Sequence, residues 1–102
     1  MEKEMVNIVT PIMREADRQA EALLDCDRAG QPAAAAEYRD WLLNHHDEVG
    51  PWALFQAVWS DRGSMSDATF QSWLQEILEK DAPQPWDKDV KFRVRLLQSR
   101  PA

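Results

Sequence analysis

Residues 51–59 read PWALFQAVW, a run in which Gln56 is the one polar side chain. A helix of this composition has no polar side to turn toward solvent, so it is expected to be the most buried element of its domain. Pro51 suits the first helical position because proline has no backbone N–H to leave unpaired there. Gly50 precedes the run and Gly63 follows it, so we expect a short interior helix between them.

Two helices are predicted before this run. Thr10 followed by Pro11 is typical of an N-cap and a first helical residue, and an apolar stripe at intervals of three and four residues follows, formed by Ile12, Ala16, Ala20 and Leu23. Gly30 ends that helix. Pro32 is expected to begin the next one, with Tyr38, Trp41, Leu42 and His45 at helical spacing. Residues 2–9 remain open, as an earlier helical turn or an arm.

The clearest start signal follows Gly63. Ser66 is expected to cap a helix, and Met65 before it to pack on Phe70 as a hydrophobic staple. Phe70 begins an apolar stripe that continues through Trp73 and Leu74. We expect Phe70, Trp73 and Trp59 to pack together at the centre of the domain.

Residues 88–98 allow two interpretations. Val90, Phe92, Val94 and Leu96 alternate with cations, which is the period of a half-buried strand. The alternative is a helix with Asp87 as its N-cap and Val90, Val94 and Leu97 facing inward. The helix is favoured, because a lone strand in a helical domain has no ladder partner, unless residues 4–9 or another subunit supply one. The chain is therefore predicted to be all-α, a compact bundle of four to five short helices in one domain over residues 1–102.

Composition narrows the class of protein. The chain has 102 residues, is 44% hydrophobic and holds five tryptophans, enough for one core. A single cysteine, Cys26, excludes an internal disulfide. No apolar run approaches the ~20 residues that span a bilayer, and no leader pattern opens the chain. We therefore expect a cytoplasmic protein without a membrane partner.

Charge is unevenly distributed along the chain. The net charge is −6, but residues 88–100 carry +4, which leaves −10 on the remainder. Trp86 stands just before this basic segment, and exposed tryptophan is enriched in interface hot spots. We therefore predict that the chain binds another protein or a second copy of itself through Trp86, Lys88, Lys91, Arg93 and Arg95.

Catalytic and metal-binding motifs are not found in the sequence. It has no glycine-rich phosphate loop, nucleophile elbow or H-E-x-x-H pattern. Asp25 and Asp27 flank Cys26 and disfavour its thiolate. His45 and His46 are adjacent, so on a helix they point about 100° apart and cannot chelate one ion, although a loop with Asp47 and Glu48 could. We predict no enzyme activity, no cofactor and no metal.

Residues 56–75 resemble a helix-turn-helix of the repressor type. Trp59 and Ser60 match its first helix, Ser64-Met65-Ser66 its turn, and Phe70 and Trp73 the buried positions of its second helix. The resemblance implies that Asp67, Ala68, Gln71 and Ser72 would meet base edges. Gly63 departs from the pattern where an apolar residue is expected. Asp67, Glu76 and Glu79 also precede the first cation, Lys80, and phosphates favour cations. Nucleic acid is therefore the weaker alternative partner.

In size, acidity and lack of catalytic motifs the chain is similar to phage and mobile-element inhibitors of host complexes, anti-CRISPR proteins among them. That resemblance implies a protein that acts by occupying a surface. The function predicted from sequence is therefore non-enzymatic protein binding, with DNA binding through residues 56–75 as the alternative.

Overall fold

The computed structural model describes residues 9–99, and five α-helices make up most of them. They are α2 (Pro11–Arg28), α3 (Pro32–Asn44), α4 (Pro51–Asp61), α5 (Asp67–Glu79) and α6 (Pro85–Gln98), with a short 3₁₀ turn η1 (Arg62–Ser64) between α4 and α5. No strand occurs over residues 9–99, which confirms the all-α prediction and the helical interpretation of residues 88–98. The expectations for residues 2–8, and the cation Arg100, lie outside the described residues.

Local signals place most helix starts. The Thr10 hydroxyl accepts a hydrogen bond from the Met13 backbone N–H at 3.2 Å, and Pro11 is the first residue of α2. Ser66 caps α5 by accepting from the Thr69 N–H at 3.1 Å. Both caps pair backbone donors that a helix leaves free in its first turn. The predicted starts of α2 and α5 are thus confirmed.

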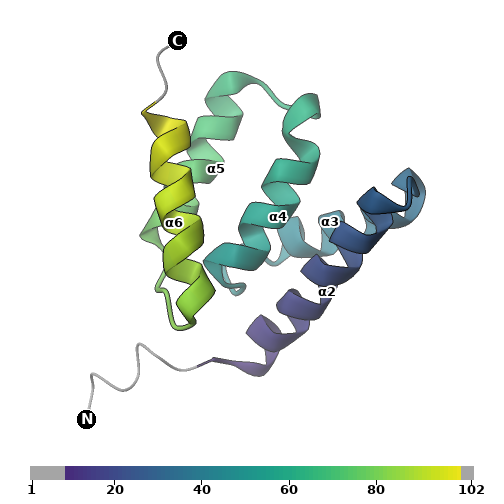
Figure 1. Ribbon diagram of the computed structural model, residues 1–102, viewed down its shortest axis with the longest axis horizontal. Helices are drawn as coiled ribbons and strands as arrows, with labels where there is room; N and C mark the ends of the chain where they lie inside the picture. The colour runs from purple at the N-terminus through teal and green to yellow at the C-terminus, as the bar shows by residue number, and fades with distance from the viewer. Residues whose placement is uncertain (1–8, 100–102) are drawn as a thin grey trace.

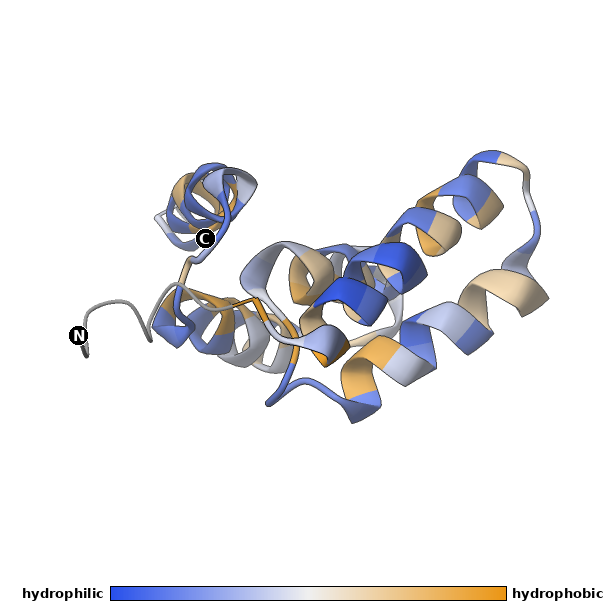
Figure 2. Cartoon of the chain, turned by 90° about the horizontal axis from the view of Figure 1, so that it is seen from below, coloured by the Kyte–Doolittle hydropathy of each residue, from blue (hydrophilic) through white to orange (hydrophobic). Residues whose placement is uncertain are grey.

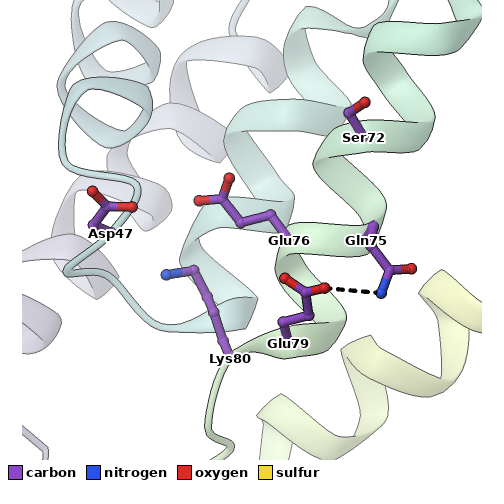
Figure 3. A pocket seen from close by; sticks show the side chains of 6 residues that line it. All are labelled: Asp47, Ser72, Gln75, Glu76, Glu79 and Lys80. Carbon is purple, nitrogen blue, oxygen red and sulfur yellow. Dashed lines mark hydrogen bonds between the residues drawn. The ribbon is translucent and has the colours of Figure 1, made fainter.

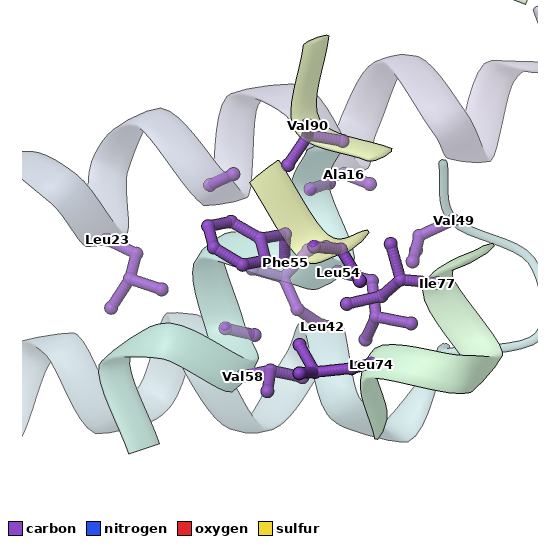
Figure 4. Close-up of a cluster of buried hydrophobic side chains, with 14 of the residues drawn as sticks. Ala16, Leu23, Leu42, Val49, Leu54, Phe55, Val58, Leu74, Ile77 and Val90 are labelled. Atoms are coloured by element: carbon purple, nitrogen blue, oxygen red, sulfur yellow. The ribbon is translucent and has the colours of Figure 1, made fainter. Parts of the chain in front are cut away.

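Helix α4 is the centre of the bundle. It contacts α2, α3, α5 and α6, and Figure 1 shows it between the α2–α3 pair and the α5–α6 pair. Its side chains make the largest buried set of any helix, namely Pro51, Ala53, Leu54, Phe55, Ala57 and Val58. Figure 4 shows Phe55 and Leu54 among residues from the surrounding helices. The expectation that residues 51–59 form the interior helix is confirmed.

The tryptophans lie further out than the sequence suggested. Trp59 is 37% exposed, and its ring lies 6.5 Å from that of Phe70 between centroids. Trp73 is half-buried and meets the His46 ring edge-on. Hence Trp59 and Phe70 do contact, but at the edge of the domain near η1, so the prediction of an aromatic centre is wrong. The centre is aliphatic around Phe55, because tryptophan is too large to be fully enclosed in most cores.

Helix α6 begins earlier than predicted. Gln84 is its N-cap and Pro85 its first residue, so Asp87 is the third helical residue and Trp86 belongs to the first turn. Pro85 can open the helix for the same reason as Pro11, since its missing N–H would have no partner there. Apolar and polar residues are interleaved along the helices around α4 (Figure 2), as expected for helices that bury one face.

Asp87 is fully buried and joins the starts of two helices. One carboxylate oxygen accepts from the Trp52 N–H at 3.2 Å, and the other accepts from the Gln84 N–H at 3.1 Å. Gly50, the N-cap of α4, has no side chain to do this, and Pro51 has no N–H. A carboxylate there also faces the positive ends of both helix dipoles. Asp87 therefore caps α4 from a different helix while it caps its own.

We expect Asp87→Ala to lower the free energy of unfolding by about 2–4 kcal/mol, since each hydrogen bond to a charged group contributes about 1.5–3 kcal/mol and the lost desolvation penalty offsets part of that. The matched control is Asp89→Ala on the exposed side of the same helix, expected to change stability by about 0.5 kcal/mol or less. Urea unfolding of both variants measures the difference. Equal effects would contradict the capping role.

Two neighbouring carboxyls couple stability to pH. Burial raises the pKa of Asp87, although the N–H groups of Gln84 and Trp52 and the charge of Lys91 lower it. Burial likewise raises the pKa of Asp17, the amide of Gln84 lowers it, and the charges of Asp87 and Glu21 raise it further. A carboxyl with a higher pKa in the folded state binds more protons there than in the unfolded chain. Its contribution to stability is therefore greatest in acid and is lost as pH rises through the native pKa.

We therefore expect Asp17→Asn to increase the free energy of unfolding more at about pH 7 than at about pH 4, close to the ordinary aspartate pKa of about 3.9. The comparison is made by urea unfolding at both pH values. The control Glu37→Gln, at an exposed position of α3, measures the effect of removing one surface charge. An Asp17→Asn effect that is the same at both values, or larger in acid, would refute the sign.

Candidate functional site

Helix α6 has apolar residues on two opposite sides. Val90 and Val94 are buried and Leu97 is half-buried, as predicted for the inward face. Phe92 is 62% exposed and Leu96 is 54% exposed, although both are large apolar residues. At 3.6 residues per turn, Phe92 lies on the opposite side of the helix from the Val90–Val94 stripe. Phe92 and Leu96, four residues apart, therefore form a ridge that faces solvent.

Cations flank this ridge. Lys88 lies one turn before Phe92 and Arg95 lies three residues after it, and both are exposed. Residues one turn apart share a helix face. We call the surface made by Lys88, Phe92, Arg95 and Leu96 the outer face of α6. It is apolar along the Phe92–Leu96 ridge and positive on the side of Lys88 and Arg95, while the exposed Asp89 lies on the other side of the ridge.

Trp86 and Arg93 lie on the flank of α6 that faces α4. Trp86 is 44% exposed, in agreement with the expectation of an exposed tryptophan, and the Arg93 guanidinium lies 6.0 Å from the centre of the Phe55 ring. Both residues line a small hollow of about 130 Å³ with Trp52. The two residues are therefore close to the outer face but do not lie at its centre.

Lys91 differs from the expectation. Its ammonium donates to the backbone carbonyl of Lys80, just after the end of α5, and the residue is half-buried. On the same flank, the Gln98 amide donates to the Gln75 side chain of α5 at 3.2 Å. Lys91 thus fastens α6 to α5, whereas Lys88, Arg93 and Arg95 are exposed.

Phe92 and Leu96 were missed in the sequence because they fitted the alternating pattern of a strand. The signal was nevertheless present. Once Val90, Val94 and Leu97 are assigned to the inward face of a helix, the geometry leaves Phe92 and Leu96 no place in the core. Two large exposed apolar residues one turn apart are then the features to explain.

A second cluster lies between the α3–α4 loop and α5. The Nδ1 atom of His46 meets a carboxylate oxygen of Glu76 and lies 3.2 Å from Asp47 Oδ1. The three residues offer one ligand atom each, all within 4.8 Å of one another. Figure 3 shows Asp47, Glu76 and Lys80 pointing toward the same hollow, of about 480 Å³. His46 and Asp47 were identified in the sequence, but Glu76 was missed. Glu76 lies 30 positions from His46, so no local sequence pattern connects the two residues.

His45 points elsewhere, as predicted for adjacent residues. Its ring stacks on Trp41 with centroids 4.1 Å apart, and its Nδ1 lies 2.7 Å from the Trp41 carbonyl oxygen. His45 is the C-cap residue of α3. It therefore completes a helix end and leaves His46 as the histidine that faces the carboxylates.

The helix-turn-helix segment has a mixed surface. Helices α4 and α5 are joined by η1, with Asp67, Ala68 and Ser72 exposed on α5 and Gln71 half-buried. Of the nearby cations, Lys80 at the end of α5 donates its ammonium to the His46 carbonyl, and Arg62 in η1 lies over the Trp59 ring. Since duplex DNA is bound largely through cations that meet phosphates, the charges on this part of α5 oppose that role.

In comparisons with protein-family models, curated proteins and solved structures, no significant match to this chain is found. Over residues 9–99, none of the helices has both the length and the apolar character needed to cross a bilayer.

We expect the purified, tag-free protein to hold no stoichiometric zinc after dialysis. The cluster supplies a single histidine, the Asp47 side chain is 85% exposed, and the ammonium of Lys80 enters the same hollow. Structural zinc sites have four ligands, mostly cysteine and histidine. Elemental analysis measures the content. One zinc per chain that is lost in His46→Ala and kept in His45→Ala would overturn this prediction.

Proposed function

We propose that this chain is a non-enzymatic protein-binding protein that docks through the outer face of α6. The observation that supports this most is the exposure of Phe92 and Leu96, one turn apart and opposite the core. Exposing two large apolar side chains in one patch has an energetic cost that a partner removes. The exposed Trp86 and Arg93 extend the contact on one side, and both residue types are enriched in interface hot spots.

The proposed partner is another protein with an apolar groove and an acidic rim. Apolar anchors at i and i+4 on one helix face are the pattern by which an amphipathic helix lies in a groove. Lys88 and Arg95 beside the anchors would meet the acidic rim and speed the encounter at low salt. A second copy of the chain also offers an acidic surface, since the chain outside residues 88–100 carries −10.

We further propose that binding inhibits the partner, as with the phage-type inhibitors that the chain is similar to. A protein that covers a groove excludes whatever else binds there. Inhibition in this form needs affinity and shape, and it needs no catalytic group on the protein itself. The exposed ridge on α6 supplies the surface for such a contact.

We expect Phe92→Ala/Leu96→Ala to weaken partner binding at least about 30-fold, since truncated anchors cost about 1–2 kcal/mol or more each. Lys88→Glu/Arg95→Glu should also weaken it, in a manner that depends on ionic strength. Partners are captured from host lysate and identified, and the purified pair is then measured by calorimetry. Thermal unfolding should stay within a few degrees, because these side chains are exposed.

Matched controls separate docking from folding. Glu37→Gln/Asp40→Asn changes two exposed charges on α3 and should leave partner affinity unchanged. Lys91→Glu should lower stability, because its ammonium holds the end of α5. If sizing shows a dimer that both α6 variants dissolve, the occupant of the face is a second copy. If both variants bind a purified partner as the natural chain does, the proposed face is wrong.

DNA binding through residues 56–75 is tested with the same purified protein. A gel shift with duplex DNA at low salt should show no tight binding, because the acidic residues of α5 face the side that phosphates would approach. Tight binding with a steep inverse salt dependence would favour the alternative.

A further inference from the structure

A hollow of about 270 Å³ lies between α2, α4 and α6, lined by Asp17, Glu21, Trp52 and Trp86. It is separate from the outer face, because Trp86 lies on the flank of α6 that faces α4. The lining residues are thus two tryptophans and two acids. The volume is below the 300–1,000 Å³ of clefts that hold drug-sized molecules, so it suits one side chain.

The two carboxylates have no ion-pair partner over residues 9–99, although Arg14 and Arg18 lie within one turn of them on α2. Asp17 and Glu21 are four residues apart on α2, and like charges at that spacing repel each other. Over residues 9–99 neither forms an ion pair, whereas the neighbouring Glu15 pairs with Arg18. The polar contact of the Asp17 side chain is a hydrogen bond from the Gln84 amide at 3.2 Å. The hollow is therefore a place of unbalanced negative charge.

A contact with α6 holds the carboxylate of Asp17 in place. Gln84 holds the carboxylate from the N-cap of α6, and Asp87 lies nearby with its oxygens committed to backbone N–H groups. The charges of Asp87 and Glu21 both raise the pKa of Asp17, after burial and the Gln84 hydrogen bond. A positive group placed in the hollow would relieve this repulsion.

The indole rings define the kind of cation. Trp52 is half-buried and Trp86 is exposed, and both line the hollow. Tryptophan is the aromatic side chain that attracts cations most strongly, and arginine is the cation found most often over such rings because its guanidinium is planar. The same guanidinium bonds carboxylates through its fork of N–H donors.

We propose that this hollow binds one arginine side chain of the partner protein, stacked on the indole of Trp86 or Trp52 and hydrogen-bonded to Asp17 and Glu21. The inference rests on the proposed function for the existence of a protein partner, but the site itself needs only these four residues. Binding there gives the partner a second contact of opposite charge beside the cationic outer face of α6.

Among the chain's own cations, Arg93 lies beside the same two tryptophans. It lines the adjacent hollow of about 130 Å³ together with Trp52 and Trp86. Its guanidinium is 6.0 Å from the Phe55 ring, and Arg93 does not line the acidic hollow. If Arg93 could enter the acidic hollow, removing it would increase the affinity for an added arginine.

The test is a titration with N-acetyl-arginine-N-methylamide, followed by the indole N–H signals of the five tryptophans. The signals of Trp52 and Trp86, assigned with Trp52→Phe and Trp86→Phe, should move together with a dissociation constant on the order of millimolar. The uncharged citrulline analogue should bind at least about tenfold more weakly, since it keeps the shape and loses the charge.

Asp17→Asn/Glu21→Gln should lower the arginine affinity at least about tenfold, whereas Glu37→Gln/Asp40→Asn should not change it. If the first variant unfolds, Glu21→Gln alone, on an exposed residue, provides the comparison. Equal response to arginine and citrulline, or unchanged affinity in the acidic-pair variant, overturns the proposal. An Arg93→Ala variant that binds arginine more tightly shows that Arg93 competes for the hollow and supports the site.

The experiments distinguish a failure of the proposed function from a failure of the hollow. Lys88→Glu/Arg95→Glu should keep the free-arginine response, because neither residue lines the hollow, while it loses the partner. If instead arginine fails to bind but the outer-face variants still lose the partner, the hollow is wrong and the proposed function stands. Arginine binding with no effect of the outer-face variants on any partner leaves the hollow and removes the proposed function.

Discussion

Asp87 fixes the starts of α4 and α6 relative to each other. Its carboxylate has no contact with water, yet both oxygens accept backbone N–H groups, one from α4 and one at the start of α6. An ionised group is tolerated in such a place only when its lone pairs are filled and a positive field surrounds it. The two helix N-termini supply both, and so one buried charge fixes their relative position. Gln84 extends the link to α2 through Asp17.

The rotation of α6 about its axis follows from this junction. With Asp87 directed at α4, Val90 and Val94 one and two turns later also face the core. Phe92 is then forced to the opposite side, and Trp86 to the flank beside Trp52. The exposed ridge and the aromatic hollow are therefore products of one constraint. A rotation that buried Phe92 would take Asp87 away from the Trp52 N–H and leave a buried charge partly unpaired, which is the more costly state.

Features that depend on residues close together in the sequence were predictable, whereas features that depend on contacts between distant residues were not. Helix starts at Thr10 and Ser66 were predictable because cap and donor lie within three residues. The inward stripe of α6 was predictable from spacing alone. The capping of α4 by Asp87 was not, since donor and acceptor lie 35 positions apart. Glu76 was missed beside His46 for the same reason. The prediction for Trp59 was wrong for a different reason. Periodicity indicates which face of a helix a residue lies on, but it does not indicate how close that residue lies to the end of the bundle.

The two proposed contact surfaces also limit which partners are acceptable. Lys88 and Arg95 on the outer face favour an acidic surface, while Asp17 and Glu21 in the hollow penalise one. A uniformly negative partner such as a nucleic acid gains from the first pair and is repelled by the second. A protein with an acidic groove and one nearby arginine gains from both. Specificity is a difference between affinities, and unfavourable contacts with the wrong partner contribute to it as much as favourable contacts with the right one. Because α6 carries both Trp86 and the outer face, and Asp87 fixes its rotation, the spacing between the required acid and the required arginine is set by the fold.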